Sequence, residues 1–185
     1  MIAYNLEQAL PQATTVQELH LVGRGLRTLA PEIVQCKNLR KMVLRRNQLT
    51  TLPTWLAELP SLEEIDISDN PFVHWPDHVG PQLLVLNAEN TALRLSTDTL
   101  RAFPNLRMLN CAGCTLEGEA ATLYLPPHLE QLIFRKLAAK KLPQGLLHLS
   151  RLKILDASQN QLTQWPRDLP IRLESLNLSY NRIRS

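Results

Sequence analysis

Residues 39–49 read LRKMVLRRNQL, and residues 62–72 repeat the same pattern as LEEIDISDNPF. Apolar residues stand at the first, fourth, sixth and eleventh places of both stretches, and asparagine stands at the ninth. In the second stretch Ile65 and Ile67 flank the polar Asp66. An alternation with period two is typical of a short strand that buries one face. Each stretch therefore predicts a strand followed by a turn at the asparagine.

The pattern recurs along the chain. Residues 152–162 (LKILDASQNQL) and 173–183 (LESLNLSYNRI) match it fully, and weaker copies fill the gaps, such as LRMLNCAGCTL from Leu106. The eight copies begin at residues 16, 39, 62, 83, 106, 129, 152 and 173, so the spacing is always 23 or 21 residues. A constant period across a chain indicates stacked structural repeats. A proline that recurs in the segments between the repeated stretches also explains why the chain has 13 prolines and only 6 glycines.

These copies resemble the leucine-rich repeat family over residues 16–185. The Leu-Pro and Trp-Pro continuations, as in LTTLPTWLAEL and LTQWPRDLP, and the mixed 23- and 21-residue units are similar to bacterial members. The resemblance implies an α/β fold, a right-handed curved solenoid shaped like a horseshoe. A single unit cannot bury its own leucine face, whereas stacked units share one core. A parallel sheet should line the concave side, with short helical, 3₁₀ or extended segments on the convex side.

The chain divides into a cap and a repeat array. Residues 1–15 are expected to form an N-terminal capping helix, because Ile2, Leu6, Ala9 and Leu10 fall on one helical face. Residues 16–185 hold eight repeats, and the last is incomplete and uncapped. Its strand, around Leu176–Leu178, should present an unpaired edge, which predicts weak self-association through the C-terminal end. Whether the native chain continues past Ser185 is left open.

Composition narrows the class of protein. The chain has 185 residues, 44% of them hydrophobic, and a net charge of +3, which gives no reason to expect a nucleic-acid or membrane partner. It shows no basic and apolar leader and no apolar run that approaches a membrane span. Three cysteines without a leader fit reduced thiols. The expected location is the cytoplasm, and secretion by a non-classical route is left open.

Cys111 and Cys114 form a Cys-x-x-Cys, a spacing found in zinc sites and redox pairs. Aligned with the other repeats, however, Cys111 takes the sixth place, which points into the core, and Cys114 takes the asparagine place. We interpret both thiols as structural, since small buried cysteines behave as apolar residues. His74 and His78 have no third ligand in view, so no metal and no cofactor is expected. The asparagine place also holds Thr91 and Leu137, which predicts a break in the asparagine ladder, repaired by water or by a changed turn.

No nucleophile–base motif or phosphate loop stands out, so the chain is not expected to be an enzyme. We expect a non-catalytic module that binds a protein partner through its concave sheet. The alternative is the recognition or targeting portion of a larger effector or signalling enzyme whose other domains lie beyond residue 185. Lys41, between Glu18 and Glu64 on neighbouring strands, reads as part of a solvated ladder of opposite charges. Four further cations have no such neutralising neighbour and are a candidate surface for an acidic partner: Arg135, Lys136, Lys140 and Lys141.

The candidate binding residues lie in four consecutive repeats. Val85, Met108 and Ile154 share the third place and Ile133 stands at the fifth, so all four should point outward in a zigzag. Exposed apolar groups on one face suggest an interface, and methionine adapts to varied partners. A polar rim should surround them, formed by Glu89, Arg135 and Lys136. The alternative is that the four side chains only pack on one another, since strands favour β-branched residues anyway.

Overall fold

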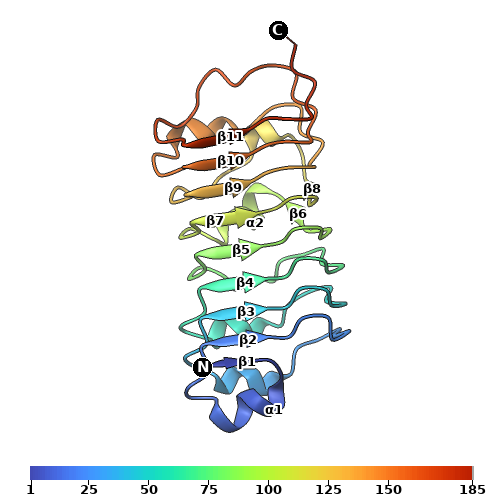
Figure 1. Ribbon diagram of the computed structural model, residues 1–185, viewed down its shortest axis with the longest axis vertical. Coiled ribbons are helices and arrows are strands. Elements are labelled where there is room, and N and C mark those ends of the chain that lie inside the picture. Colours follow the sequence, from blue (N-terminus) through green and yellow to red (C-terminus); the bar gives the residue numbers. More distant parts are fainter. Residues whose placement is uncertain (185) are drawn as a thin grey trace.

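The computed structural model describes residues 1–184. Within them, nine short parallel strands form one sheet that runs the length of the molecule (Figure 1). In spatial order they are β1 (Ile2–Ala3), β2 (Glu18–His20), β3 (Lys41–Val43), β4 (Glu64–Asp66), β5 (Val85–Asn87), β7 (Met108–Asn110), β9 (Gln131–Ile133), β10 (Ile154–Asp156) and β11 (Ser175–Asn177). From β2 onward every strand of this sheet begins at the third place of a repeat. The middle residue of each strand, such as Met42 or Leu132, points into the core.

Short helices and turns return the chain on the other side of the core. They are α1 (Leu6–Ala9), α2 (Thr97–Arg101) and the 3₁₀ helices η1 (Leu10–Gln12), η2 (Pro31–Gln35), η3 (Thr54–Glu58), η4 (Ala120–Thr122) and η5 (Gln144–His148). Local chemistry explains their starts. Ser96 caps α2, because its hydroxyl accepts a hydrogen bond from the Thr99 amide at 3.1 Å. Pro31 opens η2, where its missing N–H costs nothing. A two-stranded parallel sheet, β6 (Arg94–Leu95) with β8 (Thr115–Leu116), joins repeats 4 and 5 outside the main sheet.

The N-terminal residues differ from the single capping helix expected over residues 1–15. Ile2 and Ala3 form β1, which pairs in parallel with β2, and the helix begins only at Leu6. Ile2 is therefore an exposed strand residue, whereas Ala9 is fully buried against the first repeat. Asn5 caps the helix by accepting a hydrogen bond from the Gln8 amide at 2.8 Å. The first repeat is thus covered by one extra strand and a short helix.

The core is one continuous cluster, in which a large residue in one repeat can fill the space beside small residues in the next. At the sixth place Phe134 is fully buried, and the strand register places Cys111 and Ala157 on either side of it. Both neighbours are fully buried as well. A ring between two small residues keeps the interior closely packed, because the missing volume of each neighbour is taken up by the ring.

Trp75 and Trp165 each take the place of the leucine in a Leu-Pro pair, which favours an interpretation of both as core residues, but their environments differ. Trp75 is half-buried, and the centroid of its ring lies 4.8 Å from that of Phe103. Its Nε1 donates a hydrogen bond to the Val79 carbonyl at 2.7 Å. Trp165 is 63% exposed, so that interpretation is wrong for it. Phe103, on which Trp75 packs, belongs to the convex segment of the repeat that follows Trp75.

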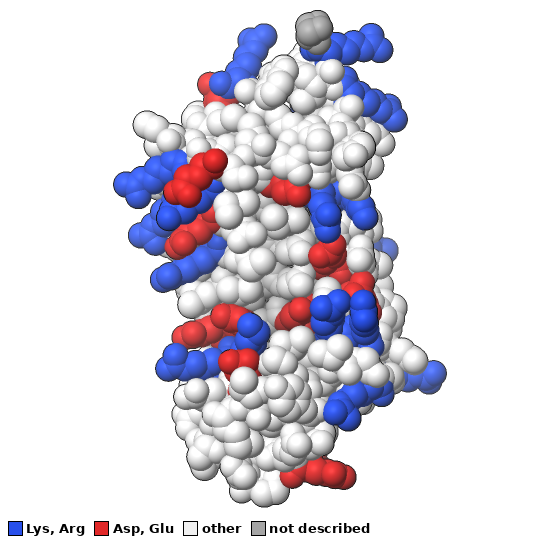
Figure 2. All heavy atoms as spheres, in the orientation of Figure 1, with Lys and Arg blue, Asp and Glu red and all other residues white. Residues whose placement is uncertain are grey.

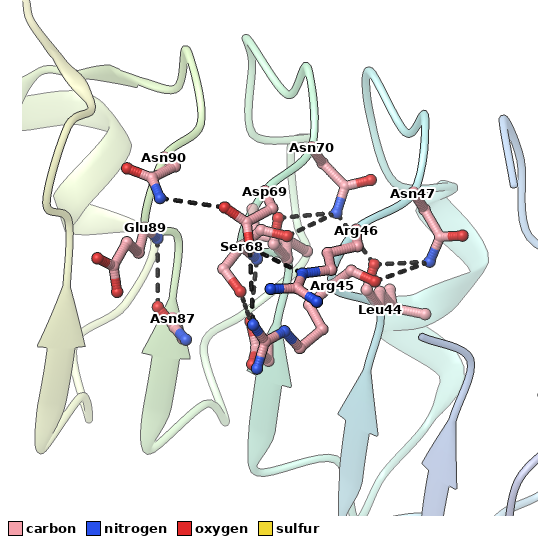
Figure 3. A network of polar contacts seen from close by, with 12 residues as sticks. Leu44, Arg45, Arg46, Asn47, Ser68, Asp69, Asn70, Asn87, Glu89 and Asn90 are labelled. Atoms are coloured by element: carbon pink, nitrogen blue, oxygen red, sulfur yellow. Dashed lines mark hydrogen bonds and ion pairs between the residues drawn. The ribbon is translucent and has the colours of Figure 1, made fainter. Parts of the chain in front are cut away.

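Buried asparagines connect successive repeats along the turn side of the sheet (Figure 3). The Asn47 side-chain amide donates to the carbonyls of Leu21 and Leu44, in two different repeats, at 2.6 and 2.8 Å. Its oxygen accepts from the amides of Arg24 and Leu26 in the preceding repeat. One side chain therefore satisfies backbone groups that are buried between two turns and would otherwise lack partners.

The predicted break in this ladder is present in repeats 4 to 6. The Thr91 hydroxyl donates to the Ala88 carbonyl at 2.8 Å, and the Cys114 thiol donates to the same carbonyl at 3.2 Å. Leu137 donates no side-chain bond, and its own amide instead donates to Asn160 Oδ1 at 3.0 Å. The turn is also changed there, because Ala138 joins Lys136 in the left-handed region with φ of 54°. Threonine and cysteine side chains thus substitute in two repeats, and a neighbouring asparagine in the third.

Candidate functional site

The outward side of the strands, which we call the sheet face, holds all four candidate apolar residues. Val85, Met108 and Ile133 are half-buried, and Ile154 is 37% exposed. Val85 pairs with Met108 across β5 and β7, and Ile154 is separated from Met108 by Gln131 of β9. Ile133 lies in the next row of the same sheet. The structure therefore places these residues together on four neighbouring strands, and we call Val85, Met108, Ile133 and Ile154 the apolar strip.

Charges gather on both flanks of the strand column and leave its centre free (Figure 2). The outward residues of the three central strands β5, β7 and β9 are all uncharged: Val85, Asn87, Met108, Asn110, Gln131 and Ile133. By contrast, the outward residues of β2 to β4 include Glu18, Lys41, Glu64 and Asp66. The sheet face is thus charged in its N-terminal third and uncharged over its centre. A partner that covers the centre of the sheet face would therefore bury few charged side chains, and burial of an unpaired charge is costly.

The asparagines at the fifth place of a repeat accept hydrogen bonds from backbone amides in the turn that follows each strand. Asn87 Oδ1 accepts a hydrogen bond from the Glu89 amide at 3.2 Å, and Asn110 Oδ1 accepts one from the Ala112 amide at 3.1 Å. Aspartate at the same place does likewise, since Asp66 accepts from the Ser68 amide. This local turn chemistry explains why Asn or Asp recurs there. The recurrence of Asn or Asp at the fifth place is visible in the sequence. The sequence analysis treats this place only as outward-facing, so it does not predict the hydrogen bond to the turn.

The expected polar rim contains an ion pair between two residues that are two repeats apart. Arg135 Nη2 donates a hydrogen bond to Glu89 Oε1, and the side-chain Nδ2 of Asn110 donates one to Glu89 Oε2 at 3.1 Å. The pair spans the repeat between them, where Ala112 is fully buried although it stands at an outward place. Arg135 is therefore neutralised, contrary to the expectation from adjacent repeats. Lys136 is exposed and, within residues 1–184, no carboxylate oxygen lies within 4.0 Å of its ammonium.

The charged part of the sheet face is a ladder of opposite charges, as expected. Lys41 Nζ lies 3.0 Å from Glu64 Oε2, and this hydrogen bond raises the pKa of Lys41. Glu18 bonds instead to His20 of its own strand at 3.0 Å. At the turns, Asp69 lies 3.8 Å from both Arg45 and Arg46 (Figure 3). Such exposed pairs stabilise little, and the interspersed carboxylates disfavour a phosphate ligand.

The two cysteines of the Cys-x-x-Cys are buried, unpaired thiols. The Cys111 thiol donates to the Ile133 carbonyl at 3.3 Å, and burial raises its pKa well above the usual value. Burial also raises the pKa of Cys114 to about 11. Because the thiolate is the reactive form, neither side chain is poised for redox chemistry or metal binding at neutral pH.

Among residues 1–184, no three His, Cys, Asp or Glu side chains are grouped so that they could hold a metal ion. Nor does any helix in that range have the length and apolar character needed to cross a bilayer.

Comparison with known proteins agrees with this geometry. A sequence model described as "Leucine rich repeat" matches residues 14–72. A leucine-rich repeat protein of Leptospira interrogans has a solved structure that is 26% identical, with a TM-score of 0.65 over 100% of this chain and 60% of that one. The chain is a leucine-rich repeat protein. The predicted family and solenoid fold are thereby confirmed.

Two further relatives show in what settings such repeats occur. Mouse podocan is 31% identical over 95% of this chain and 30% of its own length. A Roc-COR-CHAT protease of an unknown prokaryotic organism is 30% identical over 80% of this chain and 14% of its own length. The chain thus spans less than a third of these curated relatives. The leucine-rich repeat relatives are both prokaryotic and animal, so the family alone assigns no source.

Proposed function

We propose that this leucine-rich repeat protein is a non-catalytic module that binds a protein partner through the concave sheet face, centred on the apolar strip. The observation that carries the proposal is an uncharged centre on an otherwise charged surface, with four apolar side chains on neighbouring strands. Leucine-rich repeats generally mediate protein–protein interactions, which supports the class of function. No catalytic group, metal or cofactor enters the proposal.

The strip has the composition of an interface core. Apolar side chains that are already half-buried at the centre of a surface lose their remaining contact with water when a partner covers them. The Glu89–Arg135 pair borders the strip on the turn side, and Lys136 stands beyond it. A pre-formed ion pair gives a rigid polar rim, whereas Lys136 is free to contact an acidic group of the partner.

A site-specific crosslink tests this proposal. A photoreactive residue placed at Met108 should capture the partner in cells, and the same residue at Lys41 should not. With the captured protein purified, the double variant Met108→Glu, Ile133→Glu should weaken its binding by about a hundredfold or more, because two charges enter the interface core. The control is the charge swap Lys41→Glu, Glu64→Lys, which keeps the ion pair and should bind as the native protein does. Full binding by a folded double variant would move the site away from the sheet face.

The second candidate function is the recognition portion of a larger effector or signalling enzyme. The match to part of a Roc-COR-CHAT protease favours it, because that relative carries comparable repeats within a much longer chain. An antibody to residues 1–184 would report the length of the native protein in its source cell. A species of about this chain's mass favours the free-standing module, and a far larger one favours the alternative. Binding through the sheet face is common to both.

Two expectations on setting stay proposals. Three unpaired, buried cysteines support a reducing compartment such as the cytoplasm. Within residues 1–184, β11 pairs on one side only, with β10; the half-buried Leu176 lies in β11 and the half-buried Leu178 follows it. We therefore expect weak self-association through β11, seen as a rise in mean mass with concentration in light scattering. A constant monomer mass over the dilution series would contradict it.

A further inference from the structure

Strand β8 pairs along one edge only, although it lies in the interior of the repeat array. Its partner is β6 of repeat 4, outside the column of main-sheet strands (Figure 1). The Thr115 amide donates to the Leu93 carbonyl at 3.0 Å, and two residues later the Glu117 amide donates to the Leu95 carbonyl at 2.9 Å. Successive strand residues direct their N–H and C=O groups to opposite edges, so those of Leu116 face repeat 6. Within residues 1–184, neither group has a hydrogen-bond partner.

Other junctions between repeats are closed at this place by a backbone hydrogen bond. The amide at the tenth place donates to the carbonyl at the eleventh place of the preceding repeat: Gln48 to Leu26 at 2.8 Å, Thr115 to Leu93 at 3.0 Å, Gln161 to Ala139 at 2.9 Å and Arg182 to Leu162 at 2.9 Å. Between repeats 5 and 6 the matched residues are Ala138 and Leu116, and the part of the chain that the structure describes has no such bond between them. Ala138 is in the left-handed region with φ of 54°, which none of the four donors adopts. The changed turn therefore leaves this junction open, with two further repeats following it.

A groove of about 400 Å³ lies at the open edge of β8. It is bounded by η4 with the residues just before it and by residues 137–141 of repeat 6. Most of its wall is apolar, and much of it is formed by small side chains: Leu116, Ala120, Ala121, Leu137, Ala138 and Ala139. Small side chains leave room beside the strand, so a ligand in the groove can reach the backbone groups of Leu116 as well as the apolar wall.

The charge at the groove favours an acidic ligand. Lys140 and Lys141 line it, and the carboxylate among its lining residues is that of Glu119. Within residues 1–184, neither of these lysines has a carboxylate oxygen within 4.0 Å, whereas Lys41 and Lys153 each do. The two ammonium groups are therefore available to carboxylates that a ligand brings.

We propose that the groove between repeats 5 and 6 binds an extended acidic peptide segment, which adds to the open edge of β8 as a third strand. The peptide backbone would pair with the N–H and C=O of Leu116. Alternate side chains, small and apolar, would enter the groove beside Ala121 and Ala138, and carboxylates on the other side chains would pair with Lys140 and Lys141.

The backbone groups decide the class of ligand. An unpaired strand edge is a template for a second chain, and strand addition takes its affinity from main-chain hydrogen bonds and its specificity from pockets for alternate side chains. An aliphatic anion such as a fatty acid has no N–H, so it would cover the Leu116 carbonyl without giving it a donor. This site is separate from the sheet face, because β8 is not part of the nine-stranded sheet.

The test uses a short fluorescein-labelled peptide of alternating glutamate and valine. The folded chain should bind it in an anisotropy titration, more weakly as salt is added, and should not bind the same peptide with lysines in place of the glutamates. Two further forms carry N-methyl groups on one or the other alternate set of backbone nitrogens. The form that methylates the nitrogens facing β8 should bind about tenfold more weakly, since main-chain hydrogen bonds are lost while charge and side chains stay the same.

A charge variant copies residues that the protein already has at equivalent places. Lys140→Thr with Lys141→Thr reproduces Thr50 and Thr51 of repeat 2. It should bind the acidic peptide about tenfold more weakly, because two exposed charge pairs are lost, while circular dichroism stays native.

A closing variant leaves the charge unchanged. Leu137→Asn with Ala138→Gln reproduces the Asn-Gln pair of residues 160–161, whose glutamine amide closes the next junction. It should abolish peptide binding with native circular dichroism. The sheet-face variant Met108→Glu, Ile133→Glu should bind the peptide normally, so the two sites fail independently. No binding by the native chain, equal binding of both N-methylated forms and the parent peptide, or undiminished binding by the folded closing variant overturns the proposal.

Discussion

Phe134→Ala should lower the free energy of unfolding by about 3–5 kcal/mol, the usual cost of removing a fully buried ring. The ring is 0% exposed, and the sheet register gives it Cys111 and Ala157 as neighbours. Neither neighbour has the volume to close the space that an alanine would leave. The surrounding strands cannot collapse into it either, because their hydrogen bonds to one another fix their separation. Urea unfolding followed by circular dichroism measures the loss.

Phe134→Leu is the matched control, because leucine occupies the same place in other repeats, for example at Leu44. It should cost about 1–2 kcal/mol, since most of the apolar volume remains. A loss below about 1 kcal/mol for Phe134→Ala would show that the ring does not fill the space between its small neighbours. An equal loss for both variants would point to strain rather than to a cavity.

Asn160→Leu should be comparably damaging, at about 3–5 kcal/mol, although it exchanges a polar side chain for an apolar one of similar size. Asn160 is 6% exposed, and its oxygen accepts from the amides of Leu137 and Ala139 at 3.0 and 3.1 Å. Its side-chain amide donates to the Phe134 carbonyl at 2.7 Å. These three backbone groups would lose this partner, and each buried group left without a hydrogen bond costs about 1–3 kcal/mol. The changed turn at Leu137 makes the loss worse, because Leu137 provides no substitute.

Asn181→Leu is the matched control, because Asn181 occupies the same place in its repeat but is less buried than Asn160. Asn181 makes the same kinds of bond, to the Ala157 and Leu178 carbonyls and from the Leu162 amide, but it is only half-buried. Water can replace the lost bonds there, so we expect a cost of about 1–2 kcal/mol. The comparison uses urea midpoints and slopes for both variants. Equal costs for Asn160→Leu and Asn181→Leu would show that burial of the ladder contributes little.

The strands and core positions of the repeats could be predicted from the sequence because the same pattern recurs in every repeat. The apolar places, the strand starts and the inward direction of Cys111 depend only on period-two alternation and on the need to stack units over one core. The same reasoning placed Val85, Met108, Ile133 and Ile154 on one face, and the structure places them there. It also located the change in the asparagine ladder at Thr91, Cys114 and Leu137, since the missing asparagine is visible in the sequence.

What the sequence did not reveal depends on contacts that skip repeats or lie outside the repeated motif. The Glu89–Arg135 pair spans an intervening repeat over Ala112, so a comparison of adjacent strands could not find it. Strand β1 arose from residues without the motif. Trp75 packs on Phe103, which belongs to the following repeat, so its environment is not set by its own repeat.

The sequence by itself therefore determined the period, the register and the direction of each side chain, since these are properties of one unit. Only the tertiary structure decided which outward side chains are covered and which charges are paired. Those are properties of two or three units together, and they change wherever the unit length, a small residue or a neighbouring segment changes.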